Sequence, residues 1–133
     1  MLEIPENIHQ AVIAHAQGGF PLEVCGILGG SGNRVQSHYP MTNTDASNDH
    51  FMMDPKEQFA VVKALRAAGE EMIAIYHSHP ESPARPSQED IRLALTPNVS
   101  HLIVSLLDRG NPVAKAFKIS VGVVEPVRIA LTA

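Results

Sequence analysis

Two histidines, a serine and an aspartate at regular spacing are the residues of this chain most able to do chemistry. His77 and His79 stand two positions apart, seven residues separate His79 from Ser87, and two more separate Ser87 from Asp90. The apolar run 72–77 predicts a strand, whose alternation would place both imidazoles on one face. Asp90 can then return from the next element as a third ligand. Because three protein ligands and one open position distinguish a catalytic zinc site from a structural one, the pattern predicts a zinc-dependent hydrolase.

Each half of this pattern also has a plain structural explanation. Ser87-x-x-Asp90 at the start of a helix is a variant of the capping box, a device that stabilises a helix by about 1 kcal/mol. Asp90 is not expected both to bind zinc and to satisfy the Ser87 amide fully. His77 and His79 could simply be solvated side chains on one strand face. The metal site is favoured by position, because the pair follows an apolar strand and precedes the stiff segment Pro80 to Pro86, which brings a carboxylate back.

A hydrolase of this kind also needs a general base, and Glu23 is the candidate with the best position. It lies between the break at 18–21 and the apolar run 24–28. An acid at the entrance of a buried strand is costly unless it has a partner or a task. Other glutamates are spread along the chain, so position alone is a weak argument for this one.

The helices that must position these residues follow from apolar periodicity and capping signals. Residues 5–17 predict an amphipathic helix that ends at Gly18-Gly19 and buries Ile8, Ala11, Val12 and Ala16. A second helix is predicted from Asp54 as N-cap to about Ala68, with Pro55 first, Glu57 completing a capping box, and Phe59, Val62 and Leu65 buried. Ser87 to Leu95 predicts a short helix that stops near Pro97.

Strands are predicted between these helices. The expected strands are 24–28, 34–39, 72–77, 102–107 and 113–119, with a turn at 29–33, a loop at 42–49 and a last extended segment at 121–129. Helices interleave with strands, so the expected class is α/β or α+β with one sheet flanked by helices.

Composition narrows the class of protein. The length of 133 residues predicts a single domain over 1–133, and no apolar stretch is long enough to cross a membrane. We expect no signal peptide and a cytoplasmic location. Net charge is −4 without a basic cluster, which argues against nucleic acid. The single cysteine, Cys25, excludes an internal disulfide and four-cysteine zinc sites, and is expected to be a small core residue.

The remaining histidines suggest less. His9 and His15 lie on different faces of the first predicted helix and are expected at the surface, while His38, His50 and His101 are isolated near strand ends. His50 with Asp49 and Asp54 is a weak alternative metal site.

Taken together, the spaced residues resemble the signature of the JAMM (MPN+) metalloproteases. His77-Ser78-His79, Ser87 and Asp90 show no departure from its spacing, and Glu23 lies upstream as that signature requires. The segments 23–29 and 50–55 are similar to compact prokaryotic members, so the resemblance covers most of the chain. It implies that His77, His79 and Asp90 bind zinc, that Glu23 is the general acid/base, and that Ser87 helps to hold the oxyanion. It also implies a curved mixed sheet flanked by helices, similar to the deaminase fold.

The resemblance further implies a substrate class. Small bacterial relatives act on ubiquitin-like sulfur-carrier proteins, and 133 residues leave no room for the large insertions that grip ubiquitin. The expected reaction is therefore cleavage of a peptide or isopeptide bond after the Gly-Gly end of a sulfur carrier. A small-molecule amidohydrolase and a metal-free MPN-type scaffold remain alternatives. The RadC-like proteins share His-x-His-Pro but have Asn where this chain has Ser78.

Overall fold

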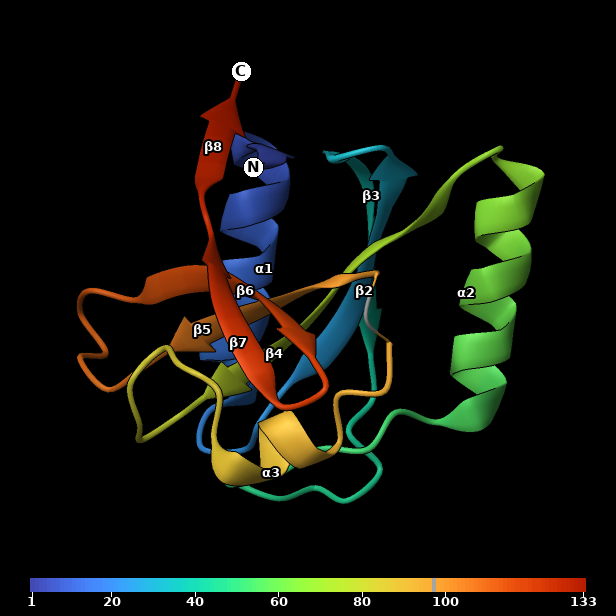
Figure 1. Cartoon of the computed structure of the whole chain (residues 1–133). Helices are drawn as coiled ribbons and strands as arrows, with labels where there is room; N and C mark the ends of the chain where they lie inside the picture. The colour runs from blue at the N-terminus through green and yellow to red at the C-terminus, as the bar shows by residue number, and fades with distance from the viewer. Residues whose placement is uncertain (97) are drawn as a thin grey trace.

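The computed structural model describes residues 1–96 and 98–133, in which eight strands form one sheet and three helices pack against it (Figure 1). The order across the sheet is β7-β6-β5-β4-β2-β3-β1-β8. The strands are β1 (Leu2–Pro5), β2 (Cys25–Ser31), β3 (Arg34–Met41), β4 (Glu71–His79), β5 (Ser100–Ser105), β6 (Val113–Ser120), β7 (Val123–Val127) and β8 (Ile129–Thr132). The helices are α1 (Glu6–Gly19), α2 (Pro55–Ala67) and α3 (Gln88–Arg92).

The sheet is mixed and strongly curved, which confirms the expected fold class. β4 runs parallel to β5 and antiparallel to β2, while β1 runs parallel to both β3 and β8. β7 and β8 lie at opposite ends of the strand order although only Arg128 separates them in sequence. The sheet therefore curls until its two edges approach each other, and α1 lies inside the curl (Figure 1).

Two helices cover opposite faces of the central strand β2. Leu28 belongs to the core cluster that contains Val12 of α1, whereas its neighbour Ile27 belongs to the cluster that contains Val61 and Leu65 of α2. This alternation follows from the two-residue period of a strand. The face covered by α2 also carries the residues of chemical interest.

The predicted helices form, with corrections to the side chains that they bury. In α1, Ile8, Val12 and Ala16 are buried at a spacing of four, but Ala11 lies beside that narrow stripe and is exposed. In α2, Val61 and Leu65 face the sheet, so Phe59, two positions before Val61, points outward and is 65% exposed. Val62 is half-buried.

The start of α2 has the expected cap but not the expected box. Asp54 accepts a hydrogen bond from Lys56 N at 2.9 Å, with Pro55 at the first position of the helix. Glu57 accepts instead from the amide and the hydroxyl of Thr42, both at 2.8 Å. This carboxylate therefore ties α2 to the end of β3.

The glycines of β2 lie within the strand, so the turn predicted at 29–33 is shorter. A Cβ on Gly30 would lie 2.0 Å from the carbonyl oxygen of Arg34, and one on Gly29 would lie 2.2 Å from Leu65 Cδ2. Both positions need glycine because neighbours approach closely, and the chain turns only at 32–33.

Several other boundaries differ from the prediction. β4 extends through both histidines to His79, and β5 begins and ends two residues earlier than predicted. The last extended segment is divided into β7 and β8, and the short β1 was not predicted. α3 ends at Arg92, so the helix is shorter than predicted and does not reach Leu95, while the stop predicted near Pro97 lies outside the described residues. Among the described residues, no helix has both the length and the apolar character needed to cross a membrane.

Candidate functional site

The two histidines of β4 lie on one face of the strand, as predicted. His77 Nε2 and His79 Nε2 are 3.1 Å apart, and the two side chains are only 3% and 5% exposed. Ser78 lies between them, and its hydroxyl accepts a hydrogen bond from Val24 N at 2.9 Å. The strand therefore presents two imidazole nitrogens to one point while Ser78 ties it to the start of β2.

Asp90 reaches the same point from α3. Its Oδ2 lies 3.2 Å from His77 Nε2 and 3.0 Å from His79 Nε2. The same oxygen accepts from Ser87 N at 2.9 Å, while Ser87 Oγ accepts from Asp90 N at 3.0 Å, which completes a capping box. The capping and ligand geometries thus coexist at one carboxylate, contrary to our expectation that they would compete.

The chemistry of these three side chains fits a metal ion. His79 Nδ1 lies 2.9 Å from Pro83 O, which can only accept, so the ring proton is on Nδ1 and Nε2 presents a lone pair. That lone pair faces the carboxylate of Asp90, and two acceptors at this distance need a proton or a metal ion between them. Neighbouring ligand atoms of a tetrahedral zinc lie about 3.3 Å apart, close to the separations observed here. Among the described residues, the trio of His77, His79 and Asp90 forms a group of possible metal ligands whose ligand atoms all lie within 4.8 Å of one another.

The pKa shifts of His79 and Asp90 also indicate that this site stabilises positive charge. Burial alone would lower the pKa of His79, but the hydrogen bonds with Asp90 and Pro83 outweigh it and raise that pKa. Burial would raise the pKa of Asp90, yet its contacts with His77 and His79 hold it well below its usual range.

Phe51 completes the surroundings of His77. The two rings stack with centroids 4.8 Å apart and planes inclined by 26°. This contact fixes the orientation of the imidazole. The sequence had indicated Phe51 only as part of the family resemblance, because an aromatic in a polar loop carries no local signal of such a contact.

Glu23 lies buried just before β2, and one of its carboxyl oxygens has no partner among the described residues. It is 4% exposed, and its Oε1 has no hydrogen-bond partner in the described part of the chain. Burial raises the pKa of Glu23 to about 7, against the opposing charges of His79 and His50 and with the support of Asp90. A carboxyl group that is buried, unpaired and half-ionised near neutrality is suited to proton transfer.

Ser87 is exposed at the start of α3. Its hydroxyl oxygen accepts from Asp90 N, so the hydroxyl proton is free to be donated in another direction. The geometry therefore allows the capping role and the oxyanion role together.

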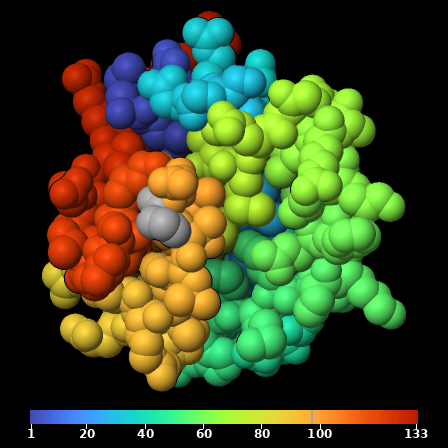
Figure 2. Space-filling view, turned by 45° about the vertical axis from the view of Figure 1, so that its right-hand side comes forward, coloured from blue at the N-terminus to red at the C-terminus, as the bar shows by residue number. Residues whose placement is uncertain are grey.

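A groove of about 380 Å³ runs beside the trio. His77 and Asp90 contribute to its lining, and the other lining residues come from 50–53, 58, 75, 89, 93–96 and 101. Figure 2 shows this side of the molecule, where the surface is hollowed between the orange segment after α3 and the green segment that leads into α2. Met52 and Leu93 are exposed apolar side chains at its walls.

Three other histidines are less exposed or less isolated than predicted. Tyr76 OH lies 2.6 Å from His15 Nδ1 and 2.7 Å from His38 Nε2, on the sheet face opposite to His77, and His9 is half-buried. Burial lowers the pKa of both His15 and His38. His101 lies on β5 in the wall of the groove.

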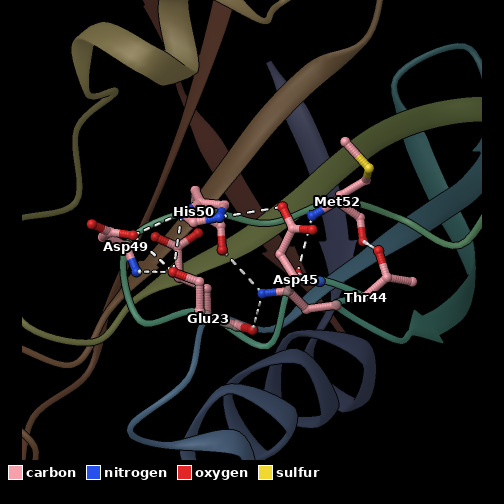
Figure 3. Close-up of polar contacts among 8 residues, drawn as sticks. Glu23, Thr44, Asp45, Asp49, His50 and Met52 are labelled. Carbon is pink, nitrogen blue, oxygen red and sulfur yellow. Dashed lines mark hydrogen bonds and ion pairs between the residues drawn. The ribbon is translucent and has the colours of Figure 1, made fainter.

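The alternative metal site around His50 does not form. Asp49 lies 2.7 Å from Nδ1 of His50, whereas Asp45 lies 3.2 Å from Nε2, on the opposite side of the ring (Figure 3). Asp54 caps α2 instead. Cys25 is fully buried in the core, as expected.

The chain matches one protein family over most of its length. A profile of the family described as prokaryotic homologs of the JAB domain matches residues 5–120. A CysO-cysteine peptidase of Mycobacterium tuberculosis is 35% identical and aligns with 97% of this chain and 91% of its own length. A desampylase of Haloferax volcanii is 32% identical, with 78% and 80% covered.

Solved structures agree with this match. Protein DSY2949 from Desulfitobacterium hafniense superimposes with a TM-score of 0.90 at 43% identity, covering 99% of this chain and 93% of that one. A structure described as "JAMM: A Metalloprotease-like Zinc Site in the Proteasome and Signalosome" superimposes with a TM-score of 0.64, covering 100% and 99%. Its identity is 19%, so this likeness concerns the fold alone.

The family match defines a compact peptidase or isopeptidase, and its fold is that of the JAMM proteins. The chain belongs to the family of prokaryotic homologs of the JAB domain.

Proposed function

We propose that this chain is a zinc-dependent peptidase or isopeptidase that cleaves after the C-terminal Gly-Gly of a ubiquitin-like sulfur-carrier protein. The convergence of His77, His79 and Asp90 beside a groove carries this proposal. Near them, Oε1 of the buried Glu23 has no hydrogen-bond partner among the described residues.

His77, His79 and Asp90 would hold the zinc ion. Their ligand atoms lie 3.0 to 3.2 Å from one another, so one ion could contact all three. Bound zinc supplies Lewis acidity, which polarises a carbonyl group and makes water more acidic. Pro83 O fixes the tautomer of His79 and Phe51 fixes the ring of His77, so both nitrogens keep their direction.

Glu23 would carry the proton of the reaction. With a pKa of about 7 it can accept a proton from water and later donate it to the leaving amine. The hydroxyl of Ser87, which keeps its proton, would donate to the oxygen of the attacked carbonyl as negative charge develops there.

The substrate would place its extended glycine tail in the groove. Glycine lacks a side chain, so two successive glycines can enter a narrow passage that larger residues cannot. The exposed apolar side chains of Met52 and Leu93 would contact the residues before the glycines. The relative named CysO-cysteine peptidase supports a substrate in which a protein is joined to an amino acid.

Mass spectrometry of carrier conjugates tests this proposal. Zinc-loaded protein is incubated with a cognate Gly-Gly carrier joined to cysteine or to a lysine side chain. We expect cleavage directly after the second glycine, and no cleavage when either glycine is replaced by valine. Intact conjugates, or equal cleavage of the valine tails, would contradict the proposal and favour a small-molecule amidohydrolase.

A further inference from the structure

Asn43, in the loop after β3, uses every hydrogen-bonding position of its side chain. Its Nδ2 donates to Glu23 O at 3.1 Å and to His50 O at 3.0 Å. Its Oδ1 accepts from Asp45 N at 3.1 Å and from Met52 N at 3.0 Å. An amide has two donor hydrogens and one carbonyl oxygen with two lone pairs, so none is left over.

These bonds close a compact loop, which we call the clamp loop (residues 43–53). Asn43 pairs with Met53 as an isolated β-bridge, and Thr44 donates from its amide and its hydroxyl to Met52 O, at 2.9 and 3.0 Å. Ser47 O accepts from Glu23 N at 2.8 Å. The clamp loop therefore grips the peptide units on both sides of Glu23, and Figure 3 shows Glu23 beside it.

The same loop forms one wall of the groove. Residues 50–53 line it, and Phe51 stacks on His77. The main chain next to Glu23 is also joined to β4, because Val24 N donates to Ser78 Oγ and Ser78 N donates to Val24 O at 3.0 Å. Glu23 is thus held between the clamp loop on one side and the histidine strand on the other.

The position of the Glu23 carboxyl group depends on these main-chain contacts. Its Oε1 has no hydrogen bond within the described residues, so no polar contact at that oxygen fixes its direction. Anchoring the backbone of a residue whose reactive group must stay unpaired is a way to place that group without neutralising it.

We propose that Asn43 is a positioning residue, which fixes Glu23 relative to the histidine strand and couples it to the wall of the groove. The effect of Asn43 on catalysis rests on the proposed function, whereas its role in holding Glu23 in place does not. Loss of the two donor hydrogens of Asn43 should release Glu23 O and His50 O and let the clamp loop move away from Glu23.

Asn43→Asp is the sharpest variant, because it keeps the shape and the acceptor oxygen but removes both donors. Asn43→Ala removes all four bonds and adds no charge. Thr44→Val is the matched control, since it removes the hydroxyl bond to Met52 O in the same loop and touches neither Glu23 nor His50.

Hydrogen exchange of the Glu23 amide, measured by NMR, is the first test. We expect exchange about tenfold faster in both Asn43 variants, and changed less than about threefold in Thr44→Val. Protection of the β4 amides should persist in all three. Unchanged exchange at Glu23 in both Asn43 variants would overturn the inference, and so would general loss of β4 protection, which would make Asn43 a requirement for folding.

Kinetics with bound zinc are the second test. We expect both Asn43 variants to keep their zinc and to lose about tenfold or more in kcat, with KM changed less than about threefold. An equal loss of kcat in Thr44→Val would reduce Asn43 to a structural residue. If the wild-type protein cleaves no carrier conjugate, the proposed function fails. The exchange measurement still decides whether Asn43 holds Glu23 in place.

Discussion

Tyr76 and His77 are neighbours on β4, yet they lie in two polar clusters of opposite character. On the α1 face, Tyr76 OH sits between the ring nitrogens of His15 and His38, at 2.6 and 2.7 Å. On the other face, His77 and His79 direct two nitrogens at the carboxylate of Asp90. The first cluster pairs its polar atoms internally, since a phenol can donate to one imidazole and accept from the other.

The second cluster leaves its polar atoms unbalanced. Two imidazole nitrogens and a carboxylate oxygen converge there, and near them Glu23 keeps a buried oxygen without a partner among the described residues. An unsatisfied buried group costs about 1–3 kcal/mol, and groups of this kind are concentrated at functional sites. Histidine content alone therefore does not distinguish the faces. What distinguishes them is whether the polar atoms already have partners.

Removing a proposed ligand should have the largest effect. His77→Ala, His79→Ala and Asp90→Ala should each lose zinc and about three orders of magnitude or more in kcat/KM, because two ligands are an incomplete site. His38→Ala, on the opposite face, is the control and should keep both. Elemental analysis checks this comparison, and full zinc content in all three ligand variants would contradict the assignment.

Glu23→Gln should keep zinc and lose roughly 10²–10⁴ in kcat, because an amide cannot take up and release the proton. Zinc content and steady-state kinetics separate this outcome from the loss of a ligand. Loss of zinc together with activity would instead make Glu23 a ligand or a structural residue.

Glu23→Gln should be more stable than the wild type when the metal is removed from both proteins. The folded-state pKa of about 7 lies above the ordinary 4.5, so between these values the folded state binds more protons than the unfolded state. Wild-type stability then falls as pH rises through this window, whereas glutamine does not titrate. The free energies of unfolding of wild type and Glu23→Gln should agree below pH 4.5 and differ by at most about 3 kcal/mol above pH 7. Denaturant titrations at several pH values measure this difference. If the free energies of unfolding of the two proteins change with pH in the same way, the raised pKa of Glu23 is contradicted.

Ser87→Ala should lose part of the rate and part of the helix cap. Loss of an oxyanion donor costs about 2.7–4 kcal/mol in the barrier, while loss of a cap costs about 1 kcal/mol in stability. Ser87→Thr keeps the hydroxyl and is the control. A Ser87→Ala protein that is less stable but fully active would leave Ser87 only its capping role.

Tyr76→Phe should affect stability alone. Removal of the hydroxyl leaves ring nitrogens of His15 and His38 unpaired, at an expected cost of about 1–3 kcal/mol. Thermal unfolding should show this loss while zinc content stays complete and kcat changes less than about twofold. A variant that loses zinc would show that the two faces are not independent.

Local patterns predicted those features of the site that depend on neighbouring residues. The two-residue period of β4 placed His77 and His79 on one face, and the Ser87-x-x-Asp90 spacing predicted a helix cap that the structure contains. The fold class followed from the order of helices and strands, with β1 missed because its partners β3 and β8 are distant in sequence.

Features that depend on packing between distant segments were not predicted. The pairing of Tyr76 with His15 and His38 requires α1 and β3 to meet over β4. The exposure of Phe59 depends on which side of α2 faces the sheet, and a single amphipathic pattern left two choices. Glycines 29 and 30 indicated a turn, although close neighbours within the sheet explain them.

A zinc titration followed by ¹⁵N NMR of the histidine side chains tests whether zinc binds on one face of the sheet, because it observes both faces of β4 in one sample. We expect the Nε2 signals of His77 and His79 to shift together and to stop changing at about one equivalent of zinc, while those of His15 and His38 stay in place. Shifts of His15 and His38, or signals of His77 and His79 that do not respond to zinc, would contradict it.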